Sequence, residues 1–124
     1  MKTGVAAFLV TFVFFVVVFA ADDPVWIKDG FGTGNDYIQM NDSQKRAYAM
    51  GAINGMLLAP LFGAPKEEMQ WFESYVVKMT DKQVAAILSK FLADNPGRWH
   101  EGLHVLMYAA IKEAHDKSRS IDRK

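Results

Sequence analysis

The segment from Thr80 to Leu92 constrains the fold of this chain more than any other. Thr80, with Gln83 three residues later, matches a capping box, which predicts that a helix begins here. After this start, apolar residues recur at the spacing of a single helix face: Val84, Ile87, Leu88, Phe91 and Leu92. Strand-like alternation appears nowhere. The sequence therefore predicts an all-α fold, a small single-domain bundle of about four helices.

Caps and prolines mark the other three predicted helices. Asp42 suits the N-cap of the first, which then runs to about residue 58. Pro65 suits the first position of a second helix. Asn95 suits the cap of the last helix, with Pro96 at its first position.

The N-terminal residues have the order of an export signal. Lys2 precedes an almost continuous apolar run over residues 5–19, and Val18-Phe19-Ala20 fits a small-residue cleavage site. We therefore expect residues 1–20 to be a signal peptide, and the mature chain to be periplasmic or secreted without a stable membrane anchor. An uncleaved anchor is the alternative, but a run of about 15 residues is shorter than the roughly 20 that a spanning helix needs.

The mature chain divides into three predicted parts. Residues 21–35 hold a proline and three alternating glycines, and are predicted to form a flexible arm. The GxGxG spacing without a preceding strand does not suit a phosphate-binding loop. Residues 36–116 are the predicted helical domain, which opens with a short turn over residues 36–40. Residues 117–124 are a predicted basic tail.

The charge and the lack of cysteine exclude several functions. Loss of Lys2 with the signal peptide leaves 13 basic and 14 acidic side chains, a net charge of −1. That balance gives no electrostatic footprint for nucleic acid. A chain without cysteine also has neither disulfides nor a thiol nucleophile.

The sequence HEGLH matches the HExxH pattern of zinc metallopeptidases, with His100 and His104 as ligands and Glu101 as base. On the predicted last helix, both histidines would lie along the edge of the buried stripe. A catalytic zinc normally needs a third protein ligand. Where one zincin class has its glycine and third histidine, this chain has Met107 and Ala110. We therefore expect no metal, no cofactor and no catalysis, and keep the zinc metallopeptidase as an alternative.

Three aromatic residues are candidates for a protein interface. Trp71 and Tyr75 form a second stripe on the second helix, beside its main apolar face, and either a partner or a wide buried face would explain them. Phe62 lies in the break before that helix. On the first helix, Gly51 and Gly55 share one face, which predicts close approach of another backbone.

The order of these motifs resembles a known family. MTDKQVAAILSKFLADNPGRWHEGLHVLMYAAIKEAH, preceded by GNDYIQM and RAYAMGAINGM, is similar to the Tai-type immunity proteins that neutralise type VI secretion amidases. The resemblance spans residues 34–115. It implies a compact helical domain, often dimeric, that binds a cell-wall amidase and blocks its active site without catalysis of its own. Members of the family commonly carry cysteines that pin the first helix, and this chain has none.

The leading expectation is therefore an exported binding or inhibitor protein, whose partner is a cell-wall amidase or, in a homodimer, a second copy of the chain. Besides the metallopeptidase, a general periplasmic chaperone is an alternative that fits the size and the location. No residue pattern is specific to a chaperone.

Overall fold

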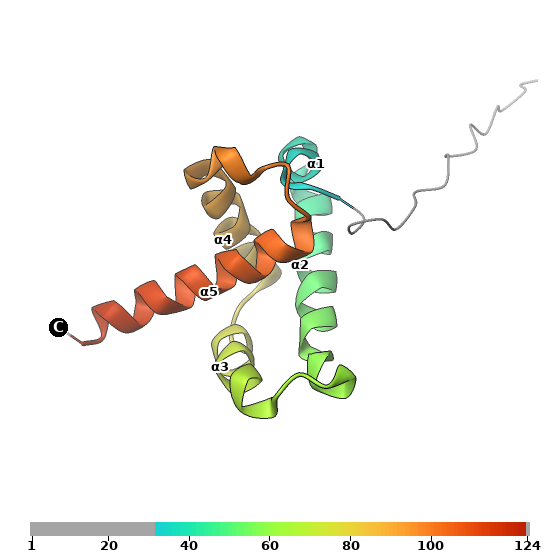
Figure 1. Ribbon diagram of the computed structural model, residues 1–124. Coiled ribbons are helices and arrows are strands. Elements are labelled where there is room, and N and C mark those ends of the chain that lie inside the picture. The colour runs from blue at the N-terminus through green and yellow to red at the C-terminus, as the bar shows by residue number, and fades with distance from the viewer. Residues whose placement is uncertain (1–31, 124) are drawn as a thin grey trace, which may run out of the picture.

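The computed structural model describes residues 32–123, and these form a small helical domain (Figure 1). Five α-helices occur in this range, with two short 3-10 helices between them. They are α1 (Gly34–Gln39), α2 (Asp42–Leu57), η1 (Ala59–Phe62), α3 (Lys66–Val76), α4 (Asp81–Asp94), η2 (Pro96–Arg98) and α5 (Leu103–Ile121). Residues 32–123 contain no strand, only an isolated bridge between Thr33 and Gly102. The predicted all-α fold is confirmed.

The core lies where α4 packs against both α2 and α5. In Figure 1, α5 crosses the bundle and ends at the C-terminus, while α3 lies at the end of the molecule opposite α1. The largest buried side chains come from α1, α3, α4 and α5, namely Tyr37, Phe72, Leu88, Leu92, Leu103, Leu106, Met107 and Ile111. The apolar stripe predicted on residues 84–92 supplies the α4 part of this core.

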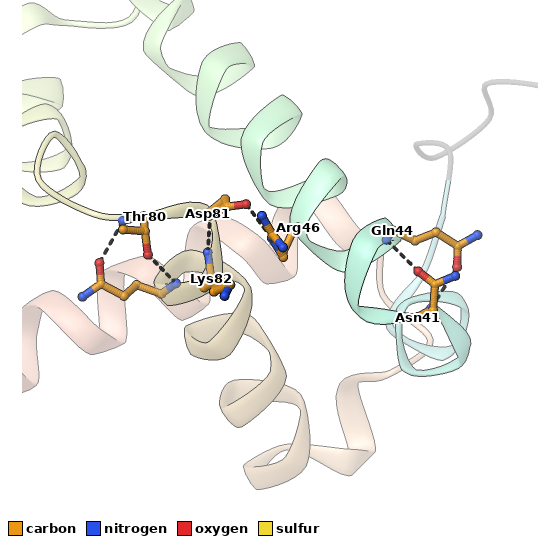
Figure 2. A network of polar contacts seen from close by, with 7 residues as sticks. Asn41, Gln44, Arg46, Thr80, Asp81 and Lys82 are labelled. Atoms are coloured by element: carbon orange, nitrogen blue, oxygen red, sulfur yellow. Dashed lines mark hydrogen bonds and ion pairs between the residues drawn. The ribbon is translucent and has the colours of Figure 1, made fainter.

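Capping boxes fix the starts of α2 and α4 (Figure 2). At α4, the Gln83 N–H donates to Thr80 Oγ1 at 3.2 Å, and the Thr80 N–H donates to Gln83 Oε1 at 2.8 Å. This start was predicted and is confirmed. At α2 the cap is Asn41 rather than Asp42, because Asn41 Oδ1 accepts from the Gln44 N–H at 2.9 Å and Gln44 Oε1 accepts from the Asn41 N–H at 3.0 Å.

An ion pair joins α2 to the beginning of α4. Arg46 Nε lies 2.6 Å from Asp81 Oδ2, as Figure 2 shows. The hydrogen bond from Arg46 lowers the pKa of the Asp81 carboxyl below its ordinary value. Asp81 is also in the first turn of α4, where the helix dipole favours a negative charge. One side chain thus serves both the helix start and the contact between two helices.

The predicted arm, residues 21–35, extends too far toward the C-terminus, because α1 begins at Gly34. Residues 34 and 35 already belong to α1, which extends over most of the predicted turn at 36–40. Asp36 explains the start of α1: its Oδ2 accepts from the Thr33 N–H at 2.7 Å and from Thr33 Oγ1 at 2.8 Å. The rest of the arm and the predicted signal peptide, residues 1–20, lie outside the described residues.

The basic residues after position 116 continue the last helix, which the prediction ended there. The Lys117 ammonium pairs with the Glu113 carboxylate one turn earlier, an arrangement that supports a helix. Arg119 lies in the last turn, where a positive charge complements the helix dipole. Over residues 32–123, we find no helix with the length and apolar character that crossing a bilayer demands.

Candidate functional site

The HEGLH segment does not lie on one helix. His100 and Glu101 are in a turn and a bend, Gly102 is extended with ψ of 132°, and α5 begins only at Leu103. The prediction of a last helix that starts at Asn95 and carries the whole motif was therefore wrong. Two histidines four residues apart share a helix face only if the helix runs through both of them.

The backbone of this segment bonds to a distant part of the chain instead. Trp99 and Glu101 carbonyls accept from the Asn35 and Gly34 N–H groups at 2.9 and 3.3 Å. The Leu103 N–H donates to the Gly32 carbonyl at 2.8 Å. These bonds satisfy groups that a helix would pair internally. The two glycines at positions 97 and 102, each costly in a helix, were the sequence signal for this interruption.

Arg98 holds the glutamate of the motif. Arg98 Nε and Nη2 donate to the two Glu101 carboxylate oxygens at 2.6 and 2.7 Å, a bidentate pair. The hydrogen bonds lower the pKa of Glu101 and raise that of Arg98. A general base for water works best with a pKa near the working pH, so this pairing shifts Glu101 away from that role.

The two histidines are both exposed, and His104 is on the first turn of α5. Within residues 32–123, no three side chains among histidine, aspartate and glutamate are close enough to share a metal ion. The geometry indicates a structural role for the RWHEGLH stretch. It forms the turn into α5, where the Trp99 indole N–H donates to the Leu92 carbonyl at 2.7 Å.

Trp71 and Tyr75 face α5 of the same chain. The ring centroid of His115 lies 4.9 Å from that of Trp71 and 5.1 Å from that of Tyr75. Tyr108 meets the edge of Trp71 at 6.1 Å, and Lys112 Nζ lies 5.5 Å above it. The aromatic stripe thus packs α3 on α5 and is half-buried. A contact between these two residues and a partner protein stays a prediction. Such a contact would use the parts of the two side chains that α5 does not cover.

Phe62 belongs to a cluster of exposed apolar side chains where α2 passes into η1. Phe62 is 85% exposed and Leu61 is 79% exposed, with Leu57 and Leu58 at 41% and 49%. We call these four residues the apolar corner. Gly63, at a φ of 98° that favours glycine, turns the chain away from them. Clusters of exposed large apolar side chains on a soluble domain commonly mark a contact surface.

Only Phe62 of the apolar corner was a candidate from the sequence. The available signal was MLLAPLF, residues 56–62, an apolar run without a polar residue that leads from the end of α2 into the connection before α3. Such connections run over the surface and are usually polar. An unbroken apolar run at this place therefore indicates exposed apolar surface.

A second apolar surface lies between α2 and the beginning of α5. This α2–α5 groove has a volume of about 830 Å³, and its lining includes Gly32, Met40, Tyr48, Met56, Val105 and Tyr108. Gly51 and Gly55 also line it. A Cβ built on either glycine has no heavy atom within 4 Å, so the predicted close approach of another backbone does not occur within residues 32–123.

Comparisons with known proteins identify no relative. The chain matches no protein-family model, no curated protein and no solved structure. The fold and the surface define it as a small all-α domain with exposed apolar surface.

Proposed function

We propose that this chain is an exported binding protein that inhibits a peptidoglycan amidase by covering it, as an immunity protein does. The observation that carries the proposal is the apolar corner, where Leu61 and Phe62 expose most of their side chains. Exposed large apolar residues cost solubility, and they give binding energy when a partner covers them.

The motif that suggested an enzyme does not compete with this proposal. His100 is in a turn, Glu101 is paired with Arg98, and His104 is on α5, so the geometry of a zincin helix is missing. The resemblance to Tai-type immunity proteins supplies the kind of partner. The apolar corner supplies a surface that could bind this partner.

The test is inhibition of enzyme activity. The mature chain, residues 21–124, is added to a purified secreted peptidoglycan amidase of the same organism, and cleavage of cell-wall peptides is measured. We expect activity to fall to a plateau near one chain per enzyme, because a specific interface saturates. Full activity at a large excess of the chain would overturn the proposal.

Two further outcomes separate the alternative functions. Equal binding of chemically unfolded proteins and of the folded amidase would indicate a chaperone, since a chaperone recognises exposed apolar segments rather than one surface. A chain that dimerises through the apolar corner would lose amidase binding as its concentration rises. Sedimentation at several concentrations measures that competition.

A further inference from the structure

We infer that residues 24–31 of this chain, just before the described part, occupy the α2–α5 groove. The groove is open and apolar, and no side chain among residues 32–123 fills it. The inference is independent of the proposed function, because Leu61 and Phe62 do not line the groove.

The position of Gly32 favours this occupant. Gly32 lines the groove itself, and its carbonyl accepts from the Leu103 N–H at 2.8 Å. The neighbouring Thr33 bridges to Gly102. Because Gly32 is fixed at the groove, the residues that precede it in the sequence are held near the groove at a high effective concentration.

The chemistry of residues 24–31 matches the lining. The sequence PVWIKDGF contains four large apolar side chains, Val25, Trp26, Ile27 and Phe31, with only one lysine and one aspartate between them. Burying a side chain such as tryptophan removes a large apolar area from water. The lining offers Met40 and Met56, whose flexible side chains adapt to aromatic shapes.

The reach of the segment is sufficient. Eight extended residues span at most about 26–29 Å. The stretch of α2 along the groove, from Tyr48 to Met56, rises only about 12 Å. The segment therefore reaches the far end of the groove even if it is not fully extended.

The two glycines give the groove its depth. Gly51 and Gly55 are exposed and their missing side chains leave open space, yet each costs about 1 kcal/mol of helix propensity relative to alanine. A tryptophan ring or an extended backbone laid over them would use that space. The backbone that was predicted to approach Gly51 and Gly55 closely would then come from residues 24–31.

Disulfide trapping tests the inference, because the natural chain has no cysteine. Trp26→Cys or Ile27→Cys is combined with Gly55→Cys in the mature chain, residues 21–124. The control pairs the same arm cysteines with Ala93→Cys, an exposed residue beside Tyr37 and Trp99 that is near the same tether but outside the groove. Circular dichroism checks that each variant is folded.

We expect the groove pair to close at least about tenfold faster than the control pair, as a monomer, because docking raises the local concentration of the two thiols. Equal rates would overturn the inference. Preferential disulfide-linked dimers would overturn it as well, since they would put a second copy in the groove.

A second measurement uses one cysteine only. In the Gly55→Cys chain, adding Trp26→Ala and Ile27→Ala should raise the rate of thiol alkylation at least about fivefold, because the thiol is then uncovered more often. An unchanged rate, in a variant with unchanged helix content, would show that residues 24–31 do not cover the groove.

Discussion

Two tyrosines show how single residues hold the first helices onto the core. Tyr37 is only 1% exposed, and its hydroxyl donates to the Ala85 carbonyl at 3.0 Å. Tyr48 meets the Tyr37 ring edge-on at a centroid distance of 6.2 Å. Burial raises the pKa of both phenols, that of Tyr48 to about 12. The folded state therefore keeps protons that the unfolded chain gives up.

The consequence is a loss of stability in alkali. An unfolded tyrosine has a pKa near 10, so between about pH 10 and 12 the unfolded chain binds fewer protons and unfolding becomes easier. We expect the urea midpoint to be flat from pH 8 to 9 and to fall from pH 10 to 11. Tyr48→Phe should reduce this fall. An equal fall in the variant would assign the effect to other groups.

Gly34 is the glycine that the fold depends on. An added Cβ would lie 2.9 Å from the Trp99 Cα and 3.0 Å from both Leu92 Cδ2 and the Trp99 carbonyl oxygen. Since two of these atoms are backbone, Gly34→Ala should lower the free energy of unfolding by about 1–3 kcal/mol. Urea denaturation measures it.

Gly97→Ala is the matched control. Nothing lies within 4 Å of a Cβ at Gly97. This substitution should change the free energy of unfolding by no more than about 1 kcal/mol, in the stabilising direction, because alanine restricts the unfolded chain. Equal losses in both variants would contradict the packing of α1 against the turn into α5.

At the scale of helices, the sequence predicted what local chemistry determines. The start of α4 follows from Thr80 and Gln83, which are three residues apart and cap each other. The segment from Asn95 to Gly102 was mispredicted because its backbone bonds to residues 32–35, more than 60 residues away along the chain. No local pattern encodes that contact.

Thr80→Ala tests the cap of α4. Loss of the Oγ1 acceptor leaves the Gln83 N–H without its partner, so the free energy of unfolding should fall by about 1 kcal/mol. Thr80→Ser keeps an acceptor at the same place and should recover most of the loss. A loss below about 0.3 kcal/mol in urea denaturation would contradict the role of this cap.

At the scale of the whole molecule, exposure separates the candidate surfaces. Phe62, Trp71 and Tyr75 were equal candidates in the sequence, but only assembly of the helices decides which side chains are covered. His115 on α5 covers Trp71 and Tyr75, whereas Phe62 remains 85% exposed beside Leu61. The sequence could therefore name the aromatic candidates, but it could not predict which of them the assembled helices leave exposed.

The central proposal is that the chain binds a partner protein through the apolar corner. The direct measurement is calorimetric titration of a secreted peptidoglycan amidase of the same organism with the mature chain and two single variants. Phe62→Ala removes a side chain from the corner. Ile121→Ala removes one that is 73% exposed in the last residue of α5, outside the corner.

We predict that Phe62→Ala weakens binding about 30-fold or more, as truncation of an interface anchor worth about 2 kcal/mol does, with unchanged circular dichroism. Ile121→Ala should bind as the natural chain does. Equal affinities for all three proteins, or no binding by any of them, would contradict binding through the apolar corner.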